Sequence, residues 1–422
     1  MQKEPKEYAT EPVPDASTVA WFRVALVASM IPFSLPTFLT GLEVSAVSSP
    51  QRTVNILLAG ALILTVIGSI TAGIGASTRL SSYMLNRVAF GTRGAALVNM
   101  AFAISLLGWF GVNIDLFSGA VIRLADDLFD MVIPGWPVEL FAGVIMTVTT
   151  IFGFRAINML SMLLVPVLMV VTVFLICGSL DVLPLPELLA RRSAEEISFG
   201  DGVSSVVGAV IVGAVILPDI TRFILHWRGA VYLVIFSYFL VNLTVMGAGG
   251  IAAAALEQDD LLSIMITLGI GWAAFAVVIL GSWVLNSLNL YSTMLSVEST
   301  LLGLNYRVLI LVSGSLGTLA AFADILDFFL SFVFYLSIVF VPVAGVIAVD
   351  YLILRREAYR EQRLELERPA RAAAIASWAC GASAALAGSL GWLTLSGIAV
   401  VDAMLVSALA YYLVIRLGGG GH

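Results

Sequence analysis

Residues 28–41 read ASMIPFSLPTFLTG, with Pro32 and Pro36 four positions apart in an otherwise apolar segment. A proline removes one intrahelical donor and clashes with the preceding turn, so this pair predicts a helix that unwinds around Phe33, Ser34 and Leu35. Backbone exposed inside a bilayer is tolerated only where it lines a cavity or is buried in protein. A pair of ordinary proline kinks, which are common in transmembrane helices, is the alternative interpretation.

A second weak point lies in residues 206–223, VVGAVIVGAVILPDITRF, where Gly208, Gly213 and Pro218 interrupt another apolar segment. When apolar segments are counted along the chain, these two interrupted stretches are the first and the sixth. Broken helices in corresponding positions indicate an inverted-repeat secondary transporter whose binding site lies near the middle of the membrane.

The composition of the whole chain agrees with a membrane protein. It has 422 residues, of which 60% are hydrophobic and 12% charged, whereas a soluble domain is about half apolar and a quarter charged. No polar region is long enough to fold separately. We therefore predict one all-α transmembrane domain over residues 21–416, a polar N-terminal segment at 1–20, and a cloning remnant at 417–422.

A helix needs about 20 mainly apolar residues to cross the hydrocarbon core, and this criterion predicts twelve spans. Their expected bounds are 21–47, 52–77, 94–122, 137–154, 157–180, 199–222, 229–256, 263–296, 306–324, 326–354, 371–395 and 398–416. With both termini inside, the inner segments would hold 17 of the 21 Lys and Arg residues. Because cytoplasmic loops collect basic residues, we expect both termini in the cytoplasm.

Several segments resemble the bacterial cytosine permeases of the nucleobase cation symporter family. They are STRLSSYMLNRVAFGTRG (77–94), expected to be the loop before span 3, GWFGV (108–112), MTVTTIFGFRAINMLSMLLVP (146–166), Asp219 with Arg222 and Phe223, and VPVAGVIAVDYLILRR (341–356). The resemblance runs through nearly the whole chain. It implies a leucine-transporter-type fold of five plus five inverted helices with two peripheral ones, and a bacterial cytoplasmic-membrane location.

The resemblance also implies a substrate site between broken helices 1 and 6 and helices 3 and 8. A planar heterocycle would stack on Trp109, because a rigid π-face beside a broken helix suits a flat polar ligand. The candidate contacts from the other helices are Phe33, Ser34, Ser105, Asn286 and Asn289. The alternatives are that Trp109 only packs between helices and that the asparagines only join helices.

Some positions depart from the family pattern. Leu106 stands where the family has a glutamine, and Ala209 and Val210 stand where it has a serine and a phenylalanine. Changing the groups that pair with a substrate changes the preferred ligand. We therefore expect a small planar nitrogen compound, nucleobase-like such as cytosine or a purine, with a hydantoin, ureide such as allantoin, creatinine-like or guanidine-like compound as the alternative.

The coupling ion is open between sodium and a proton. Val284 and Leu285 replace the consecutive hydroxyl residues with which sodium-dependent family members bind the ion, which leaves weak sodium candidates at Ile31, Phe33, Ser282 and Ser287. Intramembrane carboxylates are costly and functional by default. Asp115, six residues after Trp109, is the candidate for a coupling proton or a cationic ligand, unless it lies near the outer water and is ionised.

Other functions have little support. The sequence contains no HExxH, GxSxG, Walker or clustered Cys/His pattern, so we expect neither an enzyme nor a cofactor. We also expect no nucleic-acid partner and no obligatory protein partner, and membrane lipid as the surroundings. The expected function is import by alternating access, coupled to a cation.

Overall fold

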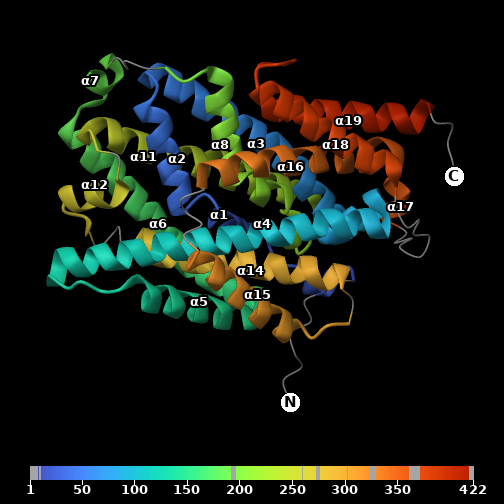
Figure 1. The fold of residues 1–422 in the computed structure, drawn as a ribbon, viewed down its shortest axis with the longest axis horizontal. Coiled ribbons are helices and arrows are strands. Elements are labelled where there is room, and N and C mark those ends of the chain that lie inside the picture. The colour runs from blue at the N-terminus through green and yellow to red at the C-terminus, as the bar shows by residue number, and fades with distance from the viewer. Residues whose placement is uncertain are drawn as a thin grey trace.

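The computed structural model describes residues 8, 11–191, 196–258, 260–271, 276–301, 303–323, 329–360 and 371–417. The regular secondary structure of these ranges is helical, apart from one isolated parallel bridge between Val19 and Ile224 (Figure 1). The prediction of an all-α fold is confirmed for the described part of the chain. Residues 1–7 of the predicted N-terminal segment and residues 418–422 of the predicted cloning remnant lie outside it.

Eight helical segments of the described ranges are long and apolar enough to cross a membrane. They comprise α3 (Pro50–Thr78), α4 (Ser82–Phe129), α6 (Gly153–Val182), α8 (Phe199–Val215) with α9 (Pro218–Thr221), α10 (Trp227–Val234) with the π-helical η2 (Ile235–Val241) and α11 (Asn242–Leu256), α16 (Phe329–Val349) with the π-helical η5 (Asp350–Leu354), α18 (Ala372–Ser389) and α19 (Ala399–Leu417). The apolar helices α5 (Gly135–Ile151) and α15 (Tyr306–Ala321) are shorter. The count of twelve spans stays a prediction.

Both predicted interruptions are present. The first segment divides into α1 (Trp21–Ser29) and α2 (Leu35–Ala46), and residues 30–34 between them are not helical. Pro36 lies in the first turn of α2, where its missing N–H costs nothing. The sixth segment is interrupted at Ile216 and Leu217, directly before Pro218, whereas α8 runs without a break through both of its predicted weak glycines.

Two predicted boundaries are wrong. The segment expected to be the loop before span 3 is largely helical, because α4 begins at Ser82 and turns at Gly91, whose φ is 75°. Buried side chains such as Tyr83 and Phe90 anchor this first part. Span 8 does not begin at residue 263, since α12 (Leu261–Thr267) is separate and is followed by Gly269 at φ 71°, then by η3 (Ala276–Leu280) and α14 (Gly281–Thr300).

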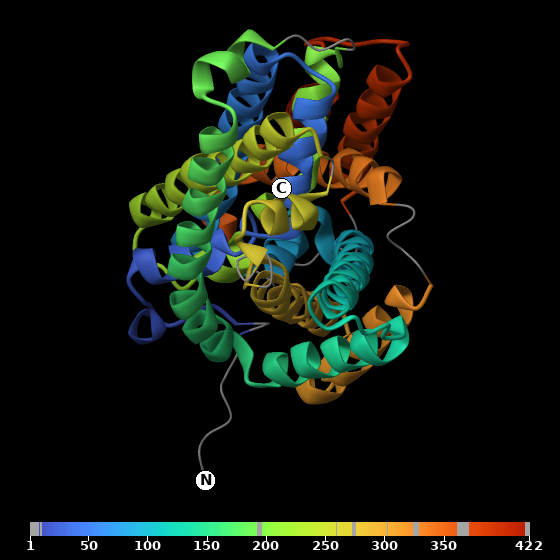
Figure 2. The same ribbon diagram turned by 90° about the vertical axis from the view of Figure 1, so that its left-hand side faces the viewer.

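The helices pack in two groups. The broken-helix group contains α1 with α2, α3, α8 with α9, and α10 with α11, which contact one another along the bundle. The α4 group contains α4, α5, α14 and α15. Seen from the end that carries α12, α4 and α14 lie side by side (Figure 2). The last helices, α18 and α19, pack on each other and on α16, to one side of both groups.

Contacts between loops define the two ends of the molecule. At one end Arg79 pairs with Asp15 at 3.0 Å, and the Arg355 guanidinium donates to the Val88 carbonyl at 3.2 Å. At the other end Arg191 pairs with Glu257, also at 3.0 Å. The orientation of the two ends relative to the cytoplasm stays a prediction.

Backbones in the broken-helix group approach each other closely where α2 crosses α11. A Cβ added at Gly41 would lie 1.9 Å from the Met246 carbonyl oxygen, and one added at Gly249 would lie 2.1 Å from the Phe38 carbonyl oxygen. Small residues at membrane-helix crossings permit this close approach. The position of α2 relative to α11 thus depends on two glycines.

We expect Gly249→Ala to lower the melting temperature of the purified protein, because α2 and α11 must separate to accommodate the methyl group, at about 1–3 kcal/mol. The matched control is Gly247→Ala in the same helix, where a Cβ meets nothing within 4 Å. Alanine is a better helix former there, so the control keeps or raises the melting temperature. Equal melting temperatures for the two variants in a fluorescence-based thermal unfolding assay would contradict the tight crossing.

Candidate functional site

A small cavity lies between the two helix groups, beside both interruptions. Its volume is about 40 Å³. Its lining residues come from four parts of the fold. They are Ile31 and Ser34 from the first interruption, Leu106 and Trp109 from α4, Ala209, Val210, Val212, Gly213 and Ile216 from α8 and the second interruption, and Leu285, Leu288 and Asn289 from α14. A water molecule needs about 10–15 Å³ and a drug-sized ligand about 300–1,000 Å³. The cavity in this conformation is therefore too small for a heterocycle.

Trp109 forms part of the α4 wall of this cavity and is 7% exposed. One turn later, the side-chain amide of Asn113 donates to the Trp109 carbonyl at 2.7 Å. Asn113 therefore uses this donor within α4. The two α4 residues that line the cavity are Leu106 and Trp109, and the Trp109 indole is the larger side chain. A flat, rigid ring at such a surface provides area for stacking a planar ligand.

Asn289 and Asn286 on α14 have different surroundings. Asn289 lines the cavity, and within the described residues no hydrogen bond engages its amide oxygen. Asn286 is fully buried outside the cavity lining, where its amide donates to the Phe110 carbonyl at 2.9 Å. The Asn286 oxygen in turn accepts from the Asn289 amide at 3.4 Å. Asn289 can therefore meet a ligand, and Asn286 orients it.

The interruption before α2 contributes both a side chain and main chain. Ser34 lines the cavity, and its hydroxyl lies 3.1 Å from the Thr37 hydroxyl. Phe33 is buried and is not a lining residue, but its carbonyl oxygen faces α14, because a Cβ added at Gly281 would lie 3.0 Å from it. Ile31 belongs to the lining. The broken segment thus brings free main-chain groups to the α14 side.

The structure places four further predicted residues away from the cavity lining. Ser105 donates to the Ala101 carbonyl one turn earlier at 2.8 Å, and Ser287 donates to the Trp283 carbonyl at 2.9 Å. Asp115 is half-buried farther along α4. The Ser282 hydroxyl is buried and has no hydrogen-bond partner among the described residues.

Three apolar residues of the cavity wall were not singled out from the sequence. They are Val212, Ile216 and Leu288. In a chain that is 60% hydrophobic, an apolar residue carries no signal of its own. The one available clue is helical spacing, because Leu285 lies four residues before Asn289 and Leu106 lies three before Trp109, on the same faces.

Arg222, directly after α9, is completely buried. Its Nε donates to the Asp219 main-chain carbonyl at 3.0 Å, and its two terminal nitrogens donate to the Tyr8 carbonyl at 2.7 Å and to the Tyr291 hydroxyl at 3.1 Å. Asp219 accepts from the Ser82 main-chain N–H at 2.9 Å. Arg222 thereby joins the end of α9 to α14 and to the N-terminal segment.

Main-chain and aromatic contacts also hold the N-terminal segment in place. We call Tyr8 with residues 11–20 the N-terminal strap. Its Val19 N–H donates to the Phe223 carbonyl at 2.8 Å, and its Val13 N–H donates to the Arg79 carbonyl at 3.2 Å. Beneath the strap, Phe154 and Phe223 stack with ring centroids 4.7 Å apart. These contacts hold the strap against the segment after α9 and against the end of α3.

The buried carboxylate of Asp350 belongs to a different contact, which attaches α19 to the bundle. Asp350 accepts from Arg355, from the Tyr359 hydroxyl at 2.5 Å and from the Tyr411 hydroxyl at 2.8 Å. Burial, together with the adjacent Asp350 charge, raises the pKa of Tyr359, so this phenol stays a donor. Neither Asp350 nor Arg355 belongs to the lining of the central cavity.

Two helices interrupted beside one cavity, which α4 and α14 line with an indole ring and an amide, define a membrane transport protein. The chain matches the family of permeases for cytosine/purines, uracil, thiamine and allantoin over residues 18–414. It belongs to this family, and it is a permease rather than an enzyme.

Individual relatives agree with this assignment. The chain is 28% identical to the cytosine permease of Escherichia coli strain K12 over 408 residues, which cover 96% of this chain and 93% of that protein. The cytosine permease of Escherichia coli O157:H7 is equally similar.

Solved structures show the same fold. Mhp1, a nucleobase-cation-symport-1 family transporter in a closed conformation with bromovinylhydantoin bound, superposes with a TM-score of 0.80 at 19% identity, covering 96% of this chain and 95% of the other. A Na+-coupled sialic acid symporter superposes with a TM-score of 0.67 at 12% identity, covering 94% and 90%.

Proposed function

We propose that this permease is a secondary active transporter that imports a small planar nitrogen compound across the bacterial cytoplasmic membrane. The observation that carries the proposal is the position of Trp109 in the cavity between the two interrupted helices, opposite Asn289. The indole would stack on the ring of the substrate, and the Asn289 amide would donate to and accept from its polar edge.

The cavity walls support a substrate with few polar atoms. Leu106, Ala209 and Val210, the positions that depart from the cytosine permease pattern, all belong to the lining. A polar edge of the substrate that faced these residues would lose its hydrogen bonds to water without forming new ones to the protein. A base with fewer polar groups than cytosine fits this wall better than cytosine does.

Transport requires the cavity to widen and then to open on alternate sides. We propose that the broken-helix group moves relative to the α4 group, with residues 30–34 and 216–217 as the hinges, within twelve spans arranged as two inverted repeats of five and two peripheral helices. The strap end would face the cytoplasm, since most basic residues lie on that side. Both termini are then cytoplasmic.

The experiment that tests the substrate class is a thermal-shift screen of the purified protein against nucleobases, hydantoins, ureides, creatinine and guanidines, followed by uptake of the best ligand. A ligand of the native state raises the melting temperature in proportion to occupancy. We expect at least one planar heterocycle to raise it and to be taken up. No shift with any of them, together with no uptake, would contradict the proposal.

For coupling, we propose a proton in preference to sodium. Val284 is fully buried and Leu285 lines the cavity, so the helix position that binds sodium in family members offers no side-chain oxygen here. Of the four sodium candidates, the Ile31 carbonyl already accepts from the Ser34 N–H at 3.3 Å, and the Ser287 hydroxyl donates to the Trp283 carbonyl at 2.9 Å. The Phe33 carbonyl and the Ser282 hydroxyl are the two candidates that remain. Two such ligands are fewer than a hard cation usually takes.

We expect uptake in proteoliposomes to persist when choline replaces sodium and to fall at least tenfold when a protonophore is added. If Asp115 is the proton carrier, Asp115→Asn removes the pH dependence of uptake, because an amide cannot titrate. Ser282→Ala is the matched variant, because it removes a sodium candidate. If a proton is the coupling ion, this variant leaves uptake unchanged. Uptake that requires sodium and is lost in Ser282→Ala would show sodium coupling instead.

A further inference from the structure

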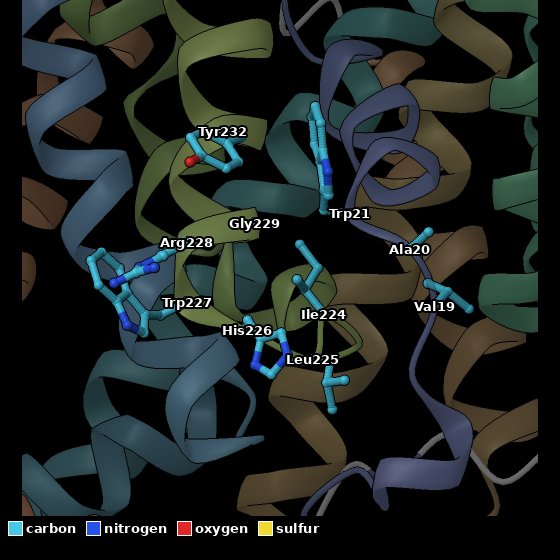
Figure 3. A pocket seen from close by; sticks show the side chains of 10 residues that line it. All are labelled: Val19, Ala20, Trp21, Ile224, Leu225, His226, Trp227, Arg228, Gly229 and Tyr232. Atoms are coloured by element: carbon cyan, nitrogen blue, oxygen red, sulfur yellow. The ribbon is translucent and has the colours of Figure 1, made fainter.

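A second cavity lies next to the strap and is separate from the central one. It measures about 610 Å³ and lies at the edge of the protein, between the start of α1 and the start of α10 (Figure 3). Its walls are Val19, Ala20 and Trp21 from the strap and α1, and residues 224–229 with Tyr232 from the segment that enters α10. It contains neither of the central interruptions, so it is not the substrate site.

Exposed aromatic side chains surround this edge cavity. Trp21 and Tyr232 stand on opposite walls with ring centroids 5.9 Å apart, and Trp227 lies next to Arg228, on the side of the cavity away from Trp21 (Figure 3). Within the described residues, neither the Trp21 nor the Trp227 indole N–H has a hydrogen-bond acceptor. Tryptophan and tyrosine in exposed clusters mark the depth of the lipid headgroups in a membrane protein.

The polar side chains of the cavity are basic or neutral. The Arg228 guanidinium lies over the Trp227 ring at 5.7 Å from its centroid, and the exposed His226 imidazole lies next to it. None of the ten lining residues is acidic, and Arg228 has no carboxylate partner among the residues that the structure describes. An unpaired cation and two free indole donors suit an anionic oxygen ligand.

The surface next to the cavity is apolar in the direction of the membrane interior. Along α10 and η2, Tyr232 is 54%, Ile235 41% and Leu240 51% exposed. These exposed residues follow one another along the segment, starting at the cavity. A ligand with a charged head group and a hydrocarbon tail matches both the basic cavity and this apolar surface.

We propose that this edge cavity binds an anionic phospholipid, with the phosphate at Arg228 and the Trp227 indole N–H and an acyl chain along Tyr232, Ile235 and Leu240. The site lies at the strap end, which in the proposed orientation is the cytoplasmic leaflet. Val19 and Ile224 are both lining residues and form the bridge that holds the strap. A bound lipid therefore stabilises the closed strap.

Native mass spectrometry and thermal shift of the purified wild type in detergent test the proposal, with phosphatidylglycerol, phosphatidylcholine and inorganic phosphate as ligands. We expect phosphatidylglycerol to bind and to raise the melting temperature more than phosphatidylcholine does. Arg228→Gln should weaken phosphatidylglycerol binding about fivefold, converted from about 1 kcal/mol per basic side chain near an anionic surface.

The matched control is Arg416→Gln, because Arg416 is also exposed and lies over an aromatic ring, that of Tyr412, at 5.3 Å. It should leave lipid binding unchanged. Equal affinity for both lipids, or equal losses in the two arginine variants, would overturn the proposal. So would inorganic phosphate that displaces phosphatidylglycerol, since the site would then bind a soluble anion. None of these readouts depends on the transported substrate.

Discussion

Trp109→Ala should abolish measurable uptake and raise the Kd of the best heterocyclic ligand about 5- to 150-fold. Stacking of a base on an aromatic side chain contributes about 1–3 kcal/mol when measured by alanine substitution. Trp109 lines the central cavity and is only 7% exposed. Its truncation to alanine therefore removes the stacking surface, and water does not replace that contact. Isothermal titration of the purified variant and uptake in proteoliposomes measure the two effects.

Two further variants make this result interpretable. Trp109→Phe keeps a flat ring and should retain most of the affinity. Trp392→Ala removes a tryptophan that is 79% exposed and should change neither binding nor uptake. An unchanged Kd in a folded Trp109→Ala protein would mean that the indole only packs between helices, which is the alternative that the sequence leaves open.

Arg222→Gln should release the N-terminal strap and reduce uptake strongly. Arg222 is completely buried and donates to Asp219, Tyr8 and Tyr291, and a hydrogen bond from a charged donor contributes about 1.5–3 kcal/mol. Loss of even one such bond should speed amide exchange of Val13 and Val19 at least tenfold. Hydrogen exchange with mass spectrometry on the peptide that contains residues 11–20 measures this.

The matched control is Arg228→Gln, at the same end of the molecule but exposed to solvent. It should leave exchange of the strap unchanged in lipid-free detergent. Tyr291→Phe removes a single acceptor and should give a smaller increase in exchange while the protein stays folded. If exchange in residues 11–20 is the same in Arg222→Gln and in the control, the strap is held by its main-chain bonds alone.

Short-range chemistry explains which parts of the fold could be predicted. The proline pair at 32 and 36 and the proline at 218 act on their own helices, so both interruptions followed from the sequence. The start of α4 did not, because Ser82 to Phe90 is polar enough to resemble a loop and becomes helical by burying Tyr83 and Phe90 against the rest of the protein. The break between α12 and η3 depends on Gly269, a single residue in an apolar stretch.

The candidate site divides in the same way. Trp109, Ser34 and Asn289 could be selected because an aromatic ring, a hydroxyl or an amide stands out in an apolar helix. Asn286 stands out equally, yet its amide joins α14 to α4 at the Phe110 carbonyl. Which of two asparagines three residues apart faces a cavity depends on the rotation of the helix against its neighbours, and the sequence of one helix does not contain that rotation.

The sequence by itself determined the class of protein and the two interruptions, because each depends on composition or on local backbone chemistry. Only the tertiary structure decided which residues line the central cavity, that Arg222 joins α9 to α14 and to the N-terminal strap, and that an aromatic and basic cavity lies at the strap. Those features arise between segments distant in the chain, such as Tyr8 and Arg222 or Trp21 and Tyr232, and only packing brings them together.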